Sequence, residues 1–251
     1  KTWTTRKLLA WMGDAFAKAE LDSPRLCAEM LLAHVIGCDR LKLYTEPDRP
    51  AAPLERQSLR ELTARALKGE PVQYLVGQGW FFSLPFFVDE RVLIPRPASA
   101  TIVEEVLQHA RVTPGFGAGE GERFGQGVLL ADICTGSGCI GIALAKNMPG
   151  VHVIATDISE DAIAVATKNA QQHEVFERVD LLCGDLLEPL DVHPVAKQQH
   201  SLHYLVANPP YIPDDEWDSP DEATGVQASV KDFEPTIALR GGTDGLDFVR
   251  R

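Results

Sequence analysis

Four consecutive residues, Asn208-Pro209-Pro210-Tyr211, follow the apolar segment 204–207 and carry the most specific chemistry in the chain. An amide or aryl-amino nitrogen is a poor nucleophile because its lone pair is delocalised. An enzyme that modifies such a nitrogen has to hold the N–H groups and orient the lone pair. The side-chain oxygen of Asn208 and the backbone carbonyl of Pro209 are suited to accept two such hydrogen bonds. Pro210 stiffens the loop, and Tyr211 is suited to pack against a planar substrate group. The tetrapeptide therefore predicts group transfer to a planar nitrogen, with these four residues as the candidate catalytic residues.

A glycine-rich turn predicts the cofactor site. Gly136, Gly138 and Gly141 have the G-x-G-x-x-G spacing, in which glycines permit a tight turn and the close approach of a ligand. Asp157 lies 21 residues after Gly136, at the end of the next predicted strand, where a carboxylate accepts hydrogen bonds from ribose hydroxyls. Asp185 follows a third strand and is suited to accept a hydrogen bond from an adenine amino group. The turn fits a dinucleotide-dependent oxidoreductase or an enzyme that binds S-adenosylmethionine. The tetrapeptide favours the second, because a dehydrogenase has no use for it.

Downstream of residue 128 the sequence pattern alternates between strands and helices. Strands are predicted at 128–133, 151–156, 179–183 and 203–207, and helices at 138–147 and 160–173. Alternation of this kind is typical of βαβ units, in which a parallel sheet is covered by helices on both faces. The carboxyl ends of such strands share one edge of the sheet, so the glycine turn, Asp157 and Asn208 are expected to meet there.

The upstream part of the chain is different. Apolar residues at helical spacing in 8–19, a Ser23-Pro24 helix start and a further helix at about 54–68 predict a small bundle. The aromatic segment 72–94 predicts a β-hairpin, and the glycine-rich stretch 113–127 predicts a flexible loop. We therefore expect a helical bundle at 1–70 that serves as a packing or docking appendage, a linker with a hairpin at 71–97, and an α/β domain at 98–251.

Composition limits the function classes. With 251 residues, 45% hydrophobic and 24% charged, the chain is an ordinary globular protein, and it has no run of about 20 apolar residues that would span a membrane. Five cysteines without paired spacing predict a reducing cytoplasm and no metal site. The net charge of −12 is uneven, because residues 71–251 alone carry −14. A surface of that sign is unsuited to duplex DNA, which is bound mainly by Lys and Arg.

The chain resembles the HemK/PrmC family of protein-(glutamine-N5) methyltransferases, which modify the Gln of the Gly-Gly-Gln motif in peptide chain release factors. The resemblance spans nearly the whole chain, at 22–25, 28–32, 71–77, 92–97, 132–141, 208–211, 233–235 and 241–246. It implies an α/β, Rossmann-like class I methyltransferase domain at 98–251, with S-adenosylmethionine as cofactor and S-adenosylhomocysteine as product. A release factor is implied as partner, docked with the help of the helical bundle at 1–70. It also implies capture of the target amide by Asn208, Pro209 and Tyr211. The cofactor-binding residues it implies are Asp132, Thr135, Gly136, Ser137, Gly138, Asp157, Asp185, Leu186 and Asn208.

Three features depart from the family pattern. The segment 132–139 is closer to a related branch that methylates a glutamine of ribosomal protein L3, so that protein is an alternative substrate. Ala98-Ser99-Ala100 stand where the family has acidic residues around a Thr or Ser, and no site residue is predicted there. The chain also ends after four predicted strands, so we expect the C-terminal strands of this fold to be missing. An adenine-N6 nucleic-acid methyltransferase and an inactive binding module are the remaining alternatives.

Overall fold

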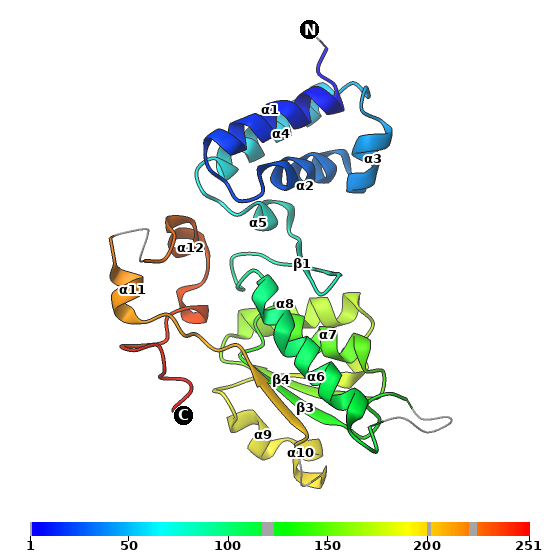
Figure 1. The fold of residues 1–251 in the computed structure, drawn as a ribbon, viewed down its shortest axis with the longest axis vertical. Coiled ribbons are helices and arrows are strands. Elements are labelled where there is room, and N and C mark those ends of the chain that lie inside the picture. Colours follow the sequence, from blue (N-terminus) through cyan, green and yellow to red (C-terminus); the bar gives the residue numbers. More distant parts are fainter. Residues whose placement is uncertain (1, 117–122, 200–201, 221–224) are drawn as a thin grey trace. The chain divides into compact units, whose positions relative to one another are not determined.

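The computed structural model describes residues 2–116, 123–199, 202–220 and 225–251, and its chain divides into two compact units. The first unit is Lys1–Gly77 and the second is Gln78–Arg251 (Figure 1). Among the described residues, none of the helices is both long enough and apolar enough to span a membrane.

The first unit is a bundle of helices. Its elements are α1 (Thr5–Lys18), α2 (Pro24–Ile36), α3 (Arg40–Thr45), α4 (Pro53–Ala66) and α5 (Val72–Val76). The predicted apolar stripe of the first helix is buried, and Met12 and Phe16 are inaccessible to solvent beside Leu31 and Leu32. The sequence analysis did not anticipate α5, whose Val72 and Leu75 join the same core. Because α5 packs against α2, the first unit extends to Gly77, seven residues past the expected end of the bundle.

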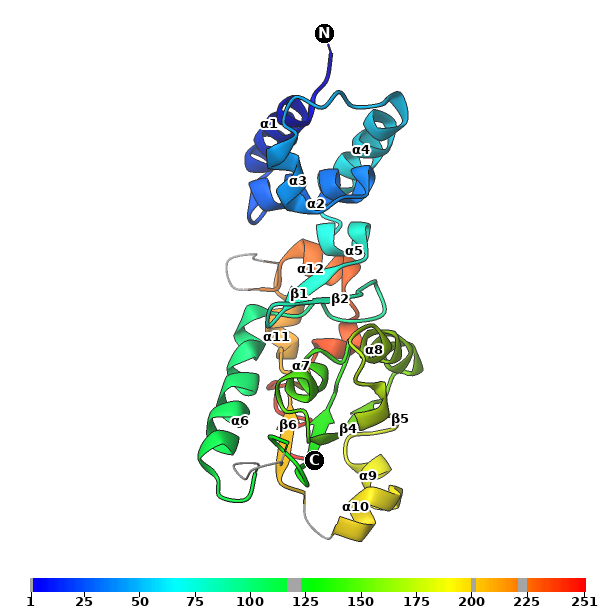
Figure 2. The ribbon, with the colours of Figure 1, turned by 90° about the vertical axis from the view of Figure 1, so that its right-hand side faces the viewer.

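The second unit begins with the expected hairpin, formed by β1 (Gly79–Phe81) and β2 (Leu84–Phe86). Phe86, which has no solvent exposure, anchors the hairpin in the core. Side chains of α8 (Glu160–Gln172) also hold it: Asn169 exchanges two hydrogen bonds with the backbone of Phe87, and Gln172 donates one to the carbonyl of Pro85. The hairpin is therefore part of the second unit (Figure 2).

A parallel four-stranded sheet forms the centre of the second unit, in the order β5-β4-β3-β6. The strands are β3 (Leu129–Ile133), β4 (His152–Asp157), β5 (Val179–Cys183) and β6 (Tyr204–Ala207), as predicted to within a residue or two. Every residue of β3 is buried, which is why this strand appears in the sequence as a continuous apolar run. The expected Rossmann-like α/β class is confirmed.

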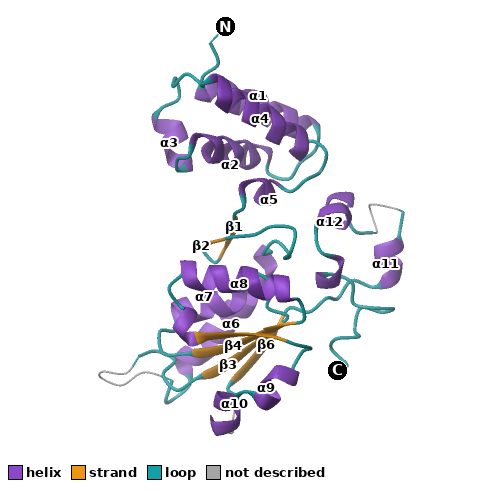
Figure 3. Ribbon diagram, turned by 180° about the vertical axis from the view of Figure 1, so that it is seen from behind, coloured by secondary structure: helices purple, strands orange, loops and turns teal. Residues whose placement is uncertain are grey.

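Helices cover both faces of this sheet. Figure 3 shows α6 (Ala100–Val112), α7 (Cys139–Asn147) and α8 on one face, and α9 (Glu188–Val192) and α10 (Pro194–Gln199) on the other. The remaining short elements are η1 (Pro97–Ser99), η2 (Phe176–Arg178), α11 (Asp214–Asp218), α12 (Ala228–Phe233) and η3 (Thr236–Ala238). The predicted loop at 113–127 lies partly outside the described residues.

Candidate active site

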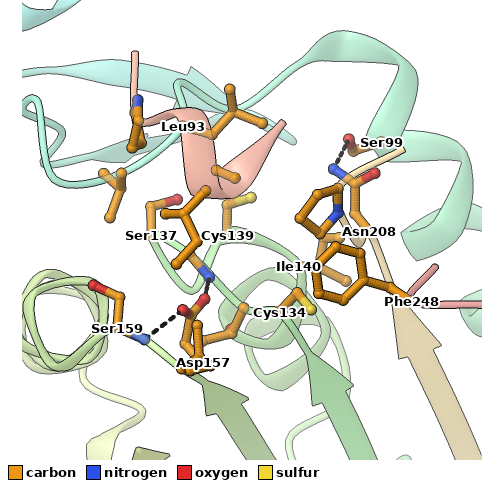
Figure 4. Close-up of a pocket in the computed structure, with 18 of the residues that line it drawn as sticks. Leu93, Ser99, Cys134, Ser137, Cys139, Ile140, Asp157, Ser159, Asn208 and Phe248 are labelled. Atoms are coloured by element: carbon orange, nitrogen blue, oxygen red, sulfur yellow. Dashed lines mark hydrogen bonds between the residues drawn. The ribbon is translucent and has the colours of Figure 1, made fainter. Parts of the chain in front are cut away.

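A cavity of about 320 Å³ lies at the carboxyl edge of the sheet, within the second unit. Its size suits a small-molecule site. It is lined by residues from the segments 91–99, 134–140, 157–159, 185–186, 208–210 and 235–238, together with Phe248 and Arg251. Figure 4 shows Ser137, Asp157 and Ser159 on one side of this cavity and Ser99 and Asn208 on the other. The predicted meeting of the glycine turn with residues from two further strands is therefore present.

The glycine turn connects β3 to α7 through residues in the left-handed region. Gly136 has φ +54° and Gly138 has φ +80°, which only glycine adopts without strain. At Gly138 a side chain would also meet Cδ1 of Ile142 at 2.8 Å, so this glycine serves the packing of α7. Gly136 lines the cavity, whereas Gly138 does not.

Asp157 fixes the shape of this turn. Its Oδ2 accepts a hydrogen bond from the backbone N–H of Gly136 at 2.8 Å, and its Oδ1 accepts one from Ser159 at 3.0 Å. Burial raises the pKa of this carboxyl above its ordinary value, while the backbone donors oppose that shift. The side chain therefore orders the turn and at the same time lines the cavity with acceptor oxygens.

Asp132 lies under the turn, outside the cavity lining. Its Oδ2 accepts hydrogen bonds from the Thr135 hydroxyl at 2.7 Å and from the Gly141 N–H at 2.9 Å, while its buried Oδ1 has no partner. Burial raises the pKa of Asp132 to about 6. Its geometry supports the turn, whereas Thr135 and Ser137 reach the cavity itself.

Asp185 and Leu186 line the cavity from the loop after β5. Leu186 has φ +46°, and its carbonyl accepts a hydrogen bond from the Thr156 hydroxyl at 2.9 Å, which ties this loop to β4. Asp185 forms an ion pair with Arg251, so one of its oxygens is engaged in this structure.

Of the tetrapeptide after β6, Asn208 and Pro210 line the cavity, whereas Pro209 and Tyr211 are not among the lining residues. The Tyr211 side chain is 61% exposed, and its backbone N–H donates to the carbonyl of Leu239. The Asn208 Nδ2 lies 3.5 Å from the hydroxyl of Ser99. The structure thus brings Asn208 to the cavity and leaves Tyr211 facing solvent.

Three residues of this region were missed by the sequence analysis. The buried Glu234 carboxylate accepts hydrogen bonds from the Ile94 N–H at 3.2 Å and from Arg96, and so joins two walls of the cavity. Asn169 of α8 donates a hydrogen bond at 2.9 Å to the carbonyl of Ser137 in the glycine turn. Ser99, in η1, contacts Asn208. The only hint of Glu234 was its place in the segment 233–235 that resembles the family.

The two thiols that line the cavity, those of Cys134 and Cys139, are not ionised at neutral pH. Burial, with nearby carboxylates contributing, raises the pKa of Cys134 and that of Cys139 to about 12, so both are protonated at neutral pH. Within the described residues, no group of His, Cys, Asp and Glu side chains is arranged to hold a metal ion.

Comparison with known proteins adds independent information. Residues 7–77 match the PrmC N-terminal domain, and residues 123–220 match the methyltransferase small domain. A release factor glutamine methyltransferase of Chlorobaculum tepidum is 39% identical over 250 residues, covering 100% of this chain and 79% of that protein. Proteins of the same name from Geobacter sulfurreducens and Rhodopirellula baltica are 40% and 38% identical, each covering 99% of this chain and 77% of the relative.

Among solved structures, the hMettl16 catalytic domain in complex with MAT2A 3′UTR hairpin 6 aligns with a TM-score of 0.46. The alignment covers 82% of this chain and 64% of that one, at 16% identity.

The sheet order, the cavity at its carboxyl edge and the matched catalytic domain define a methyltransferase with a Rossmann-like fold. The three relatives named above share 38–40% identity with nearly the full chain, and this identity shows which family of methyltransferases the chain belongs to. The chain belongs to the release factor glutamine methyltransferase family, and the resemblance noted in the sequence is confirmed.

Proposed function

We propose that this chain transfers a methyl group from S-adenosylmethionine to the side-chain amide nitrogen of a glutamine in a peptide chain release factor. The observation that carries the proposal is that Asn208, Asp157 and the glycine turn line one cavity. An acceptor for an amide N–H and acceptors for a nucleoside therefore lie within reach of a single bound pair of substrates.

The residues of the cavity fit this cofactor. Asp157 and Asp185 follow neighbouring strands and present carboxylates suited to ribose hydroxyls and an adenine amino group. Thr135, Gly136, Ser137 and Leu186 complete this side, with Asp132 and Gly138 supporting the turn from outside the cavity. When bound, S-adenosylmethionine supplies an electrophilic methyl group on a sulfonium.

In this reaction the main role of the chain is to position the acceptor nitrogen of the glutamine. The oxygen of Asn208 accepts one N–H of the glutamine amide, and the carbonyl of Pro209 accepts the second. These two contacts turn the lone pair of the nitrogen toward the place where a bound S-adenosylmethionine would present its methyl group, and the carbon–sulfur bond would break with its electron pair left on sulfur. The nitrogen then releases one proton to solvent. Orientation of this kind is worth several kcal/mol of the roughly 7–11 kcal/mol available from proximity.

The state of the cysteines fits the same proposal. The five cysteines are all free thiols, which suits the cytoplasm, where release factors act.

Pro210 shapes the loop, and Tyr211 is assigned to contact the planar amide when the substrate is bound. In this role Tyr211 moves out of solvent only on binding, in keeping with its exposure here.

The net negative charge of residues 71–251 argues against the adenine-N6 alternative, which is why a protein substrate is preferred.

The test is incubation with labelled S-adenosylmethionine and, separately, a release factor, ribosomal protein L3 and adenine-containing DNA. We expect one methyl group on the glutamine of the release factor, located by peptide mass spectrometry. Methylation of L3 alone or of DNA alone would replace this substrate assignment, and binding without transfer would identify an inactive binding module.

A further inference from the structure

Ser99 lines the cavity and contacts Asn208, and the proposed reaction does not use it. It lies at the junction of η1 and α6, and its hydroxyl is 3.5 Å from the Nδ2 of Asn208 (Figure 4). The two residues are 109 positions apart in the chain, so only the fold brings them together.

The hydroxyl of Ser99 has no role in capping the helix that it precedes. A serine before a helix usually accepts a hydrogen bond from a backbone N–H of the first turn, and does so from an extended conformation. Ser99 instead has helical dihedral angles, φ −67° and ψ −15°, and makes no such bond. Its oxygen is therefore available to Asn208.

The position of Ser99 is fixed from its other side. Arg96, three residues earlier, is bound by the Glu234 carboxylate, and the Arg96 carbonyl accepts the backbone N–H of Ser99 at 3.1 Å. The Glu234 side chain is 2% exposed, so this anchor is buried. The chain thus holds the hydroxyl in place through contacts that do not involve the cofactor side of the cavity.

We propose that the Ser99 hydroxyl is a positioning group that sets the orientation of the Asn208 side-chain amide. An asparagine amide has a donor end and an acceptor end of nearly equal size, and only the acceptor end is able to receive an N–H from the target glutamine. With Nδ2 engaged by Ser99, Oδ1 is the end left for the substrate. This inference rests on the proposed function, since it assigns Ser99 to the same reaction.

The separation of 3.5 Å is at the upper limit for a hydrogen bond. Catalytic contacts are commonly long before substrate binds and shorten in the complex. We expect Ser99 to act on the transfer step and to leave cofactor binding unchanged, because Asp157 ends β4 and Asp185 lies in the loop after β5, whereas Ser99 belongs to η1.

The test compares Ser99→Ala, Ser99→Thr and the control Thr101→Ala, which removes an exposed hydroxyl from the same helix. We expect Ser99→Ala to lower kcat for release factor methylation by about tenfold to a hundredfold, with the affinity for S-adenosylmethionine and the melting temperature unchanged. Ser99→Thr restores the hydroxyl and should recover most of kcat, and Thr101→Ala should match the parent chain. Full activity of Ser99→Ala, or a loss of activity that follows a lowered melting temperature, overturns the inference.

A second readout does not depend on activity. The sequence contains three asparagines, Asn147, Asn169 and Asn208, so selective ¹⁵N-asparagine labelling gives a small set of side-chain amide signals. The Asn208→Ala variant identifies the signal of Asn208. We expect Ser99→Ala to shift that signal alone, and Ser99→Thr to leave it near its original position. If the parent chain methylates no release factor, the proposed function fails while this spectrum still decides the contact; an unshifted Asn208 signal in Ser99→Ala contradicts the inference itself.

Discussion

The backbone N–H of Gly136 donates a hydrogen bond of 2.8 Å to Oδ2 of Asp157, and this bond joins the turn after β3 to the end of the neighbouring parallel strand β4. The bond thereby couples the glycine turn to the carboxylate that we propose as the ribose acceptor. A change at either residue is felt at the other.

Asp157→Asn tests this coupling. The amide replaces one of two oxygens that already accept backbone hydrogen bonds, so either Gly136 or Ser159 loses its acceptor. We expect S-adenosylmethionine to bind at least about tenfold more weakly, equivalent to about 1.4 kcal/mol, as measured by titration calorimetry. Asp191→Asn, which changes an exposed carboxylate on α9, is the matched control and should bind as the parent does. Equal affinities for the two variants would contradict the role given to Asp157.

Asp132 should make stability depend on pH in an unusual direction. Its pKa rises from the ordinary 3.8 to about 6 on burial, so the folded state holds this proton more tightly than the unfolded chain. The stability associated with the protonated carboxyl is present at low pH and is lost as pH rises through about 6. The parent should therefore lose about 2 kcal/mol relative to Asp132→Asn between pH 4.5 and 7.5, measured by urea unfolding. A difference that is constant across this range would show that Asp132 titrates normally.

Much of the fold follows from the sequence, for identifiable reasons. Strands such as β3 are buried on both faces and therefore appear as apolar runs, and the glycine spacing marks the turn between β3 and α7. The short helices α5, α9 and α10 were not predicted, because five or six residues give too little periodicity and owe their helical form to packing.

Some residues of the candidate site are also predictable from the sequence, and others are not. Asp157 and Asn208 are predictable because Asp157 ends one strand, Asn208 directly follows another, and both lie at the same edge of the sheet. Ser99, Asn169 and Glu234 act through contacts with segments at least 32 residues away, which no local pattern records. The assigned roles of Pro209 and Tyr211 stay predictions, since neither residue lines the cavity before substrate binds.

The buried carboxylate of Glu234 should contribute strongly to stability. Glu234→Ala leaves the Ile94 N–H without its acceptor and the Arg96 guanidinium without its partner. Because Arg96 is 39% exposed, water compensates in part, and we expect a loss of about 1–3 kcal/mol with a lowered melting temperature. Glu104→Ala removes an exposed carboxylate from α6 and is expected to leave the melting temperature unchanged. If the two substitutions lower it equally, Glu234 does not join the cavity walls as described.

The cysteines should differ in reactivity. Cys134 and Cys139 have pKa values of about 12, so on the order of one molecule in ten thousand carries the thiolate at pH 8. Cys183 is exposed. Brief treatment with iodoacetamide at pH 8, followed by peptide mass spectrometry, should modify Cys183 and spare the two cavity thiols. Rapid alkylation of Cys134 in the folded chain would contradict the buried, protonated state described here.

The most direct test of the central claim separates cofactor binding from methyl transfer at Asn208. The measurement is transfer of a labelled methyl group to a release factor by the parent chain, Asn208→Ala, and Asn147→Ala, which removes an exposed asparagine side chain on α7. Binding of S-adenosylmethionine is followed in parallel for each variant. We expect Asn208→Ala to lose at least about a hundredfold in transfer while still binding the cofactor, because the side chain supplies the orientation of the acceptor nitrogen. Transfer at the parent rate by Asn208→Ala would contradict it.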